Sequence, residues 1–251
     1  MNNFENILSN FETYDLNNDE KISLMKRIDI KYVLHINQLS NILLQAKKNY
    51  KRLRIKDRLM PVYYTTYFDT NDFIMYTAHN NGRLNRYKIR HRKYLDTNTE
   101  FLEVKFKNNK KITNKTRIYR SSNTDVLNKA DKDFITSHSP FSAEELHSSL
   151  KTSFNRVTLI NKEKNERITI DSDLKFYFLK KVIIPENLII CEVKKEPGKP
   201  LGGFEQILRN QRIKPFRVSK YCLGNYYLNN SVKHNLYKEK AAYINKITCT
   251  K

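Results

Sequence analysis

The chain contains only five glycines among its 251 residues, and it has no tryptophan. Phosphate-binding loops of the P-loop and Rossmann types need several glycines at fixed spacing before a helix. The single Gly-Lys pair, Gly198-Lys199, lies between two prolines, and no segment matches the P-loop pattern. Both classes of nucleotide-binding enzyme are therefore excluded.

Cysteines and long apolar runs are also scarce. Cys191, Cys222 and Cys249 are far apart and odd in number, which argues against a disulfide framework, and the absence of a CxxC pair argues against zinc. No stretch approaches 18 consecutive apolar residues, and the first ten residues lack the cationic and apolar regions of a signal peptide. We therefore expect a cytoplasmic protein that touches membranes only peripherally.

Positive charge is abundant. The chain has 47 lysines and arginines against 26 aspartates and glutamates, which gives a formal net charge of +21. Such an excess predicts a polyanionic partner, either nucleic acid, an anionic membrane or a phosphate-rich ligand, although a biased genome would also produce a Lys- and Asn-rich chain. We expect an N-terminal extension over residues 1–25, one folded domain over 26–228 and a basic tail over 229–251.

Two segments of strictly alternating residues lie near the middle of the chain. In residues 86–92 every second residue is a cation, and in 101–107 Glu103, Lys105 and Lys107 alternate with apolar residues. Successive side chains of a strand point to opposite faces, so this period of two predicts two strands. The turn-forming residues 96–99 between them predict a hairpin with one apolar and one charged face.

Similar patterns predict the other elements. Strands are expected over residues 27–34, 61–69, 72–79, 113–120, 156–159, 167–171, 176–184, 188–194 and 215–221. Helices are expected over residues 37–50, 123–135, 142–150 and 204–212. The fold class is α+β, with about eight antiparallel strands whose apolar faces pack against helices.

The charged strand faces permit two arrangements. An open sheet would expose a basic face to water, whereas a closed barrel with helices outside would line a tunnel that must hold water and a polyanion. Two carboxylates help here, since Glu103 and Glu192 each precede a lysine by two residues on the same face. Each could neutralise neighbouring lysines, but together they favour a site that binds phosphate through a divalent metal.

Several motifs resemble one family in order along the chain. They are R-x-D-x-K-Y at residues 27–32, YFDT at 67–70, K-I-R-x-R at 88–92, FLEVKFK at 101–107, K-x-R at 115–117, I-x-I-D at 168–171, CEVK at 191–194 and SKY at 219–221. This set resembles the VTC domain, the catalytic domain of the vacuolar transporter chaperone polyphosphate polymerases, which belongs to the CYTH-like triphosphate tunnel metalloenzymes. The resemblance covers residues 27–224.

The resemblance implies an antiparallel β-barrel that forms a basic tunnel, with ATP, inorganic polyphosphate and Mn²⁺ or Mg²⁺ as ligands. It implies phosphate-gripping or catalytic roles for Lys31, Arg90, Arg92, Lys105, Arg156, Lys220 and Arg217, and metal binding by Glu192 and Glu103. The charged strand faces add the phosphate-binding candidates Arg27, Lys88, Lys107, Lys115, Arg117, Arg167 and Lys194. Three positions depart from the usual family pattern, namely Asp29 in place of Glu, Phe154 in place of Tyr and Arg217 in place of Lys.

The function that this resemblance implies is transfer of the γ-phosphate of ATP to a growing polyphosphate chain. A phosphate acceptor is already anionic and needs no strong base, in keeping with the lack of a convincing His or Cys dyad; we interpret His91 as structural. The alternatives are a metal-dependent triphosphatase of the same fold and a non-catalytic polyanion- or nucleic-acid-binding module. Specific nucleic-acid binding is disfavoured because Tyr87 and Phe106 fall opposite the cations. Recruitment to a membrane protein or anionic membrane fits the basic tail, and the oligomeric state is not encoded in these patterns.

Overall fold

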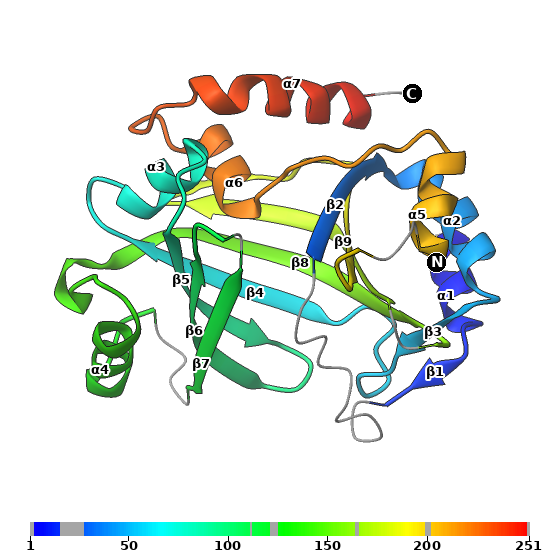
Figure 1. Cartoon of the computed structure of the whole chain (residues 1–251), viewed down its shortest axis with the longest axis horizontal. Coiled ribbons are helices and arrows are strands. Elements are labelled where there is room, and N and C mark those ends of the chain that lie inside the picture. Colours follow the sequence, from blue (N-terminus) through cyan, green and yellow to red (C-terminus); the bar gives the residue numbers. More distant parts are fainter. Residues whose placement is uncertain are drawn as a thin grey trace.

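The computed structural model describes residues 3–15, 28–110, 112–120, 125–163, 166–198 and 202–249, and its centre is one large sheet (Figure 1). The strands are β1 (Thr13–Tyr14), β2 (Ile28–His35), β3 (Tyr50–Leu53), β4 (Val62–Asp69), β5 (Arg86–Tyr94), β6 (Thr99–Lys107), β7 (Thr113–Tyr119), β8 (His147–Asn161), β9 (Glu166–Phe178), β10 (Lys181–Ile183) and β11 (Leu188–Lys195). The main path runs β2-β11-β9-β8-β4-β5-β6-β7, and every neighbouring pair on it is antiparallel. The predicted α+β class and the set of about eight antiparallel strands are confirmed.

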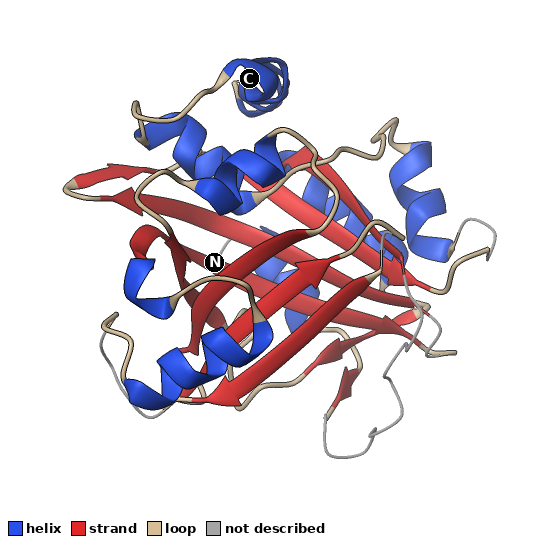
Figure 2. Ribbon diagram, turned by 60° about the vertical axis from the view of Figure 1, so that its left-hand side comes forward, coloured by secondary structure: helices blue, strands red, loops and turns tan. Residues whose placement is uncertain are grey.

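The helices lie around this sheet (Figure 2). They are α1 (Asn3–Ser9), α2 (Leu39–Ala46), α3 (Ile74–Asn80), α4 (Lys129–His138), α5 (Gly203–Asn210), α6 (Lys220–Leu228) and α7 (Asn235–Thr248), with short 3₁₀ turns at Ile36–Gln38 and Ala143–Glu145. Within the described part of the chain, no helix is long and apolar enough to cross a bilayer.

The sheet curls, so that β5, β6 and β7 cross steeply in front of the long strands β8 and β9 (Figure 1). Lys105 on β6 consequently comes within electrostatic reach of Glu192 on β11 and of Lys31 on β2, although these strands are far apart in the sheet order. The end strands β2 and β7 are not hydrogen-bonded to each other in the described residues. The result is a tunnel-like fold with a concave charged face, called the inner face below.

An extended segment, residues 211–219, helps to span the opening between the ends of the sheet. The Phe216 amide donates to the Lys31 carbonyl on β2, at 2.6 Å, and the Lys88 ammonium on β5 donates to the Ser219 hydroxyl, at 3.0 Å. This segment and the start of α6 occupy residues 215–221, so the prediction of a last strand there is wrong. Pro215 has no amide hydrogen to donate to a ladder, and the Ser219 hydroxyl accepts from the Cys222 amide and begins a helix instead.

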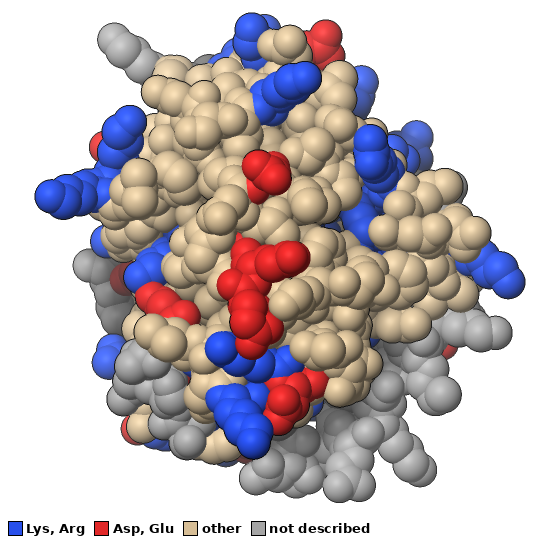
Figure 3. All heavy atoms as spheres, turned by 90° about the vertical axis from the view of Figure 1, so that its left-hand side faces the viewer, with Lys and Arg blue, Asp and Glu red and all other residues tan. Residues whose placement is uncertain are grey.

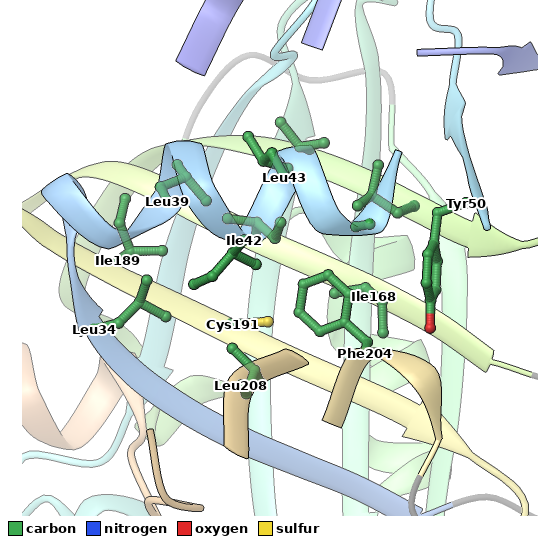
Figure 4. Packing of buried hydrophobic residues seen from close by; sticks show 14 of the residues in the cluster. Leu34, Leu39, Ile42, Leu43, Tyr50, Ile168, Ile189, Cys191, Phe204 and Leu208 are labelled. Atoms are coloured by element: carbon green, nitrogen blue, oxygen red, sulfur yellow. The ribbon is translucent and has the colours of Figure 1, made fainter. Parts of the chain in front are cut away.

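The outer side of the sheet carries the larger hydrophobic core. Apolar residues that alternate with the charged ones, such as Leu34, Ile168 and Cys191, pack beneath Leu39, Ile42 and Leu43 of α2 and beneath Phe204 and Leu208 of α5, as Figure 4 shows. The alternation of period two thus sorts each strand into an apolar outer face and a polar inner face. Helix α1 joins this core through Phe4, Ile7 and Leu8, so part of the predicted N-terminal extension is packed structure.

Helix α6 packs on the inner face at one end of the sheet, where Leu150, Phe176 and Tyr67 form a second core. The approach is close at Gly224, where an added Cβ would lie 2.6 Å from Leu150 Cδ2 and 2.7 Å from Phe176 Cδ1. Helix α7 covers this core with Tyr237, Ala241 and Ile244 buried, so much of the segment predicted as a basic tail is a packed helix.

Two other sequence predictions are wrong. Residues 72–79 were expected to form a strand, but α3 occupies them because the Asp69 carboxylate accepts hydrogen bonds from the Met75 and Tyr76 amides in the first helical turn. Residues 142–150 were expected to be helical, but they form one 3₁₀ turn and then enter β8, where pairing with β4 prevails over local propensity.

Asp69 is completely buried and joins β4, α3 and α6. Its carboxylate also accepts from the Thr70 amide and from the Tyr221 hydroxyl, the latter at 2.5 Å. Replacing Asp69 by Ala should lower the free energy of unfolding by roughly 3 kcal/mol, because it leaves several buried donors without an acceptor. The midpoint of thermal unfolding should fall by about 6–12 °C. The exposed Asp72→Ala variant is the control and should shift the midpoint hardly at all; equal midpoints for both variants would contradict this role.

Candidate functional site

The inner face brings together charged residues from seven strands. Strand register places Lys31, Glu192, Thr169 and Thr158 in one row across β2, β11, β9 and β8. A second row joins Arg90, Glu103 and Arg117, and a third joins Lys88, Lys105 and Lys115, both across β5, β6 and β7. Directly opposed residues share a face, so these rows form one charged lining.

Three carboxylates of this lining each bridge two cations. Glu192 bonds Lys31 and Lys194, Asp171 bonds Arg156 and Lys220, and Glu103 bonds Arg90 and Lys115. The Arg156 contact is bidentate, with Nε–Oδ1 at 2.5 Å and Nη2–Oδ2 at 2.7 Å. Arg90 Nε lies 2.7 Å from Glu103 Oε2, and Lys115 Nζ lies 2.8 Å from Oε1. These bridges fix the positions of the cations before any ligand arrives.

The surrounding cations keep these carboxylates ionised. Burial alone would raise the pKa of Asp171, but Arg156 and Lys220 outweigh it and lower the pKa to about 2. For Glu103, burial is likewise outweighed, by Arg90, Arg92 and Lys115, and its pKa lies well below the usual range.

Three other inner cations have no carboxylate partner among the described residues. Lys88 bonds only the Ser219 hydroxyl, Arg92 Nε bonds the Thr65 hydroxyl at 3.2 Å, and Lys105 has neither an ion pair nor a side-chain hydrogen bond in this part of the chain. Burial is the main cause that lowers the pKa of Lys88 to about 7 and, with help from Arg90, that of Lys105 to about 8. Burying unpaired positive charge is costly, so a bound anion would stabilise this cluster.

A family model for the VTC domain matches residues 26–229. The chain belongs to the VTC domain family. The resemblance stated from the motifs is confirmed, and together with the basic inner face it indicates a phosphate- or triphosphate-related function. Helix α7 begins just after the matched region. No curated protein matches the chain.

Several solved structures are similar to this VTC domain at low identity. A Vibrio parahaemolyticus protein provisionally described as an adenylate cyclase is 10% identical over 78% of this chain and 95% of its own, with a TM-score of 0.47. A Hippeastrum protein, provisionally described as an adenylyl cyclase and reported with a dominant triphosphatase activity, is 13% identical over 82% of this chain and 100% of its own, with a TM-score of 0.46. The PH1819 protein of Pyrococcus horikoshii is 12% identical over 78% and 93%, with a TM-score of 0.44.

Sequence reasoning missed the aromatic floor of the VTC domain's inner face. Phe154 and Tyr63 stack with centroids 5.4 Å apart, and the Arg156 guanidinium lies 5.1 Å and 5.0 Å from these rings. Lys220 Nζ lies 4.5 Å from the Phe154 centroid. Cation–π contact stabilises these cations without neutralising them. The alternation of the strand could have predicted this contact, because Phe154 stands two residues before Arg156 and so lies on the same face.

Not every predicted site residue enters the lining. Arg27 lies outside the described residues. Arg217 is exposed. Arg117 belongs to the second row but is exposed on the edge strand β7, with its guanidinium 4.3 Å from the centre of the Phe101 ring. Conversely, Asp171 was not among the predicted site residues, yet it organises Arg156 and Lys220. His91 lies beside Glu100, 2.7 Å away and buried, which fits its interpretation as structural.

The two acids predicted to bind metal differ in their surroundings. The Glu192 side chain is 16% exposed, and Asp29 on the neighbouring strand lies 3.7 Å from Lys194. Mg²⁺ and Mn²⁺ often take one or two carboxylates plus phosphate oxygens, so Glu192 with Asp29 fits such an ion. Both acids bond cations through both of their oxygens, but Glu103 does not fit, because its side chain is fully buried and that of Glu192 is not. In the described residues no group of three or more His, Cys, Asp or Glu side chains forms a metal site without added ligands.

The lowered pKa of Asp171 predicts a loss of stability in acid. A depressed pKa contributes stability that is present above the unfolded value of 3.8 and is lost as the pH falls through the folded value of about 2. Since Asp171 is almost fully buried, this contribution should be about 2–3 kcal/mol. Denaturant unfolding between pH 6 and pH 2 should show it, and Asp171→Asn should flatten the acid limb. An acid limb of unchanged steepness in that variant would refute this assignment.

Proposed function

We propose that the chain is a metal-dependent phosphotransferase that moves the γ-phosphate of ATP onto inorganic polyphosphate at the inner face. The observation that carries the proposal is the cluster of Lys88, Lys105 and Arg92, three inner cations without a carboxylate partner in the described residues, next to cations that carboxylates hold in place. A polyanion with closely spaced charges suits this arrangement better than a single carboxylate ligand does.

The residues of the inner face have separate tasks in this proposal. Lys88, Lys105 and Arg92 neutralise the phosphates of the bound nucleotide or polymer. Arg156 and Arg90, oriented by Asp171 and Glu103, point fixed donors at the charge that develops on the transferring group. Glu192, with Asp29, would hold Mn²⁺ or Mg²⁺, which supplies charge neutralisation at the phosphate oxygens when bound.

The carboxylates favour a phosphate acceptor over water. Asp171, Glu103 and Glu192 each bond two cations, and the pKa of each lies below its ordinary value, because cations outweigh the effect of burial. Such groups are poor general bases for activating water. A terminal polyphosphate oxygen is already anionic, so it can form the new bond to the γ-phosphorus while the bond to the β,γ-bridging oxygen breaks and ADP leaves with the electron pair.

The test is incubation with ATP and Mn²⁺ or Mg²⁺, followed by a gel stained for polyphosphate and by an assay of free phosphate. We expect a polymer ladder that disappears in Glu192→Gln and Arg90→Gln and persists in Glu145→Gln, an exposed carboxylate outside the inner face. Metal-dependent phosphate release without polymer would replace this proposal with a triphosphatase. Tight RNA binding that triphosphate cannot displace would replace both with a nucleic-acid-binding module.

A further inference from the structure

The hairpin between β9 and β10 exposes apolar side chains at its tip. Leu179 is 89% exposed, Val182 is 54% exposed and Ile184 is 49% exposed. Ile74, at the start of α3, is 49% exposed as well, and the Phe73 ring lies 6.4 Å from the Phe178 ring of the hairpin. Contiguous exposed apolar residues are uncommon on soluble surfaces and mark interaction sites.

The backbone at the tip of the hairpin is also unusual for an apolar residue. Leu179 and Lys180 form a two-residue loop, and Leu179 has a φ of +52°. Glycine, asparagine and aspartate occupy such positions easily, whereas a leucine is strained there. Phe73 beside the hairpin has a φ of +53°. Leu179 therefore occupies a position that leucine disfavours for two reasons, because the side chain is exposed to water and the backbone is left-handed.

The hairpin is held firmly on its other side. Lys181 pairs with Phe178, Val182 with Tyr177 and Ile183 with Phe176. Phe178 and Ile183 pack against the core beneath α6, while Val182 and Leu179 point away from it. The fold thus presents the tip on a fixed support.

The charges on the hairpin itself are positive. Residues 174–185 contain Lys175, Lys180 and Lys181, and the exposed acids Asp72 and Glu186 lie beyond the hairpin, next to Phe73 and Pro185 in the sequence. The flanking Asp173 carboxylate accepts hydrogen bonds from Asn155 and Ser172. On the end of the molecule shown in Figure 3, Asp and Glu gather near the middle, whereas Lys and Arg lie mainly towards the margins.

We propose that the β9–β10 hairpin docks on an anionic lipid surface. Leu179 and Val182 enter the boundary between headgroups and acyl chains, and Lys180 and Lys181 contact the headgroup phosphates. Apolar insertion combined with flanking cations is the chemistry of peripheral binding to anionic membranes. A projecting tip with lysines beside a single leucine suits this planar partner better than a protein pocket. This surface is separate from the inner face and does not depend on the reaction proposed there.

The experiment is co-sedimentation of the full chain with phosphatidylcholine vesicles, with and without about one third phosphatidylserine. We expect binding only to the anionic vesicles. Leu179→Asn should weaken it about tenfold, because an apolar side chain is lost from the interface. The double variant Lys180→Gln/Lys181→Gln should weaken it more than tenfold, since each lysine near an anionic surface contributes about fivefold.

Two controls separate the proposed contact from a loss of folding and from the loss of any exposed apolar side chain. Leu179→Asn should leave the thermal midpoint unchanged or higher, because asparagine tolerates the left-handed backbone better than leucine does. Leu44→Gln changes an equally apolar and 58% exposed leucine on α2 and should bind vesicles like the parent. No vesicle binding by the parent, undiminished binding by Leu179→Asn, or an equal loss in Leu44→Gln would each overturn the proposal.

Discussion

Raising the pH from 7 to 9 should weaken the binding of triphosphate to this VTC domain by roughly two orders of magnitude or more. The reason is the pair of half-buried lysines, Lys88 and Lys105, which have pKa values of about 7 and about 8 in the empty protein. A bound polyphosphate places negative charge beside both ammonium groups, so their pKa values rise in the complex. Binding then favours the protonated lysines.

The sign and size follow from linkage. A cation whose pKa rises on binding contributes affinity below its pKa in the empty protein, and this contribution is lost as the pH rises towards the value in the complex. At pH 9 about one Lys88 in a hundred and about one Lys105 in ten are protonated in the empty protein, and each missing proton reduces the affinity in proportion. Proton uptake should accompany binding throughout this range.

Calorimetry in buffers of different ionisation enthalpy measures both the affinity and the proton uptake. Metal is left out, so that the inorganic triphosphate is not hydrolysed during the titration. Lys88→Met should weaken binding at pH 7 and reduce the pH slope by about one proton. Lys47→Met, at an exposed lysine beyond the inner face, is the matched control and should leave both unchanged. A pH-independent affinity, with no proton uptake, would show that these lysines do not contact the ligand.

The sequence predicts the strands of the sheet better than it predicts how the sheet curls into a tunnel-like shape. Lys105, Arg90 and Glu192 were assigned to one charged face because the period of two is a local property of each strand. Whether the face becomes concave depends on the curl of the whole sheet, which brings Lys105 on β6 within electrostatic reach of Lys31 on β2, and nothing within either strand encodes that curl. The extended segment that reaches β2 through the Phe216 amide was predicted to be a strand like the others, because nothing in its own residues shows that it lies outside the ladder.

The roles of the carboxylates were hard to predict for a similar reason. Glu103 and Glu192 have the same E-x-K spacing, yet Glu103 is sealed between Arg90 and Lys115 while Glu192 is partly open. The difference arises from neighbours on other strands. The role of Asp171 depends on Arg156 of β8 and Lys220 of α6, which the fold places beside it and which its own strand does not predict.

Replacing Arg156 by Gln should reduce phosphoryl transfer about a thousandfold, because it removes a fixed, charged donor from the site of developing charge. Arg156→Lys should restore little of the activity. A single ammonium cannot bond Asp171 in the bidentate manner and also lie over Tyr63 and Phe154 as the planar guanidinium does. Initial rates with saturating ATP and metal, measured well below the unfolding midpoint, test both variants.

Loss of activity through misfolding must be distinguished from loss of the catalytic group. Arg156→Gln leaves Asp171 with Lys220 as its cation and should cost roughly 1–3 kcal/mol of stability. Adding Asp171→Asn leaves Lys220 without its carboxylate, so the double variant should lose further stability and remain inactive. Arg120→Gln breaks a more deeply buried pair with Asp131 away from the inner face, and it should lose stability while keeping its turnover. If the double variant turned over at the parent's rate, Arg156 would be a structural residue, and the transferring phosphate would have to lie closer to Arg90 and Arg92.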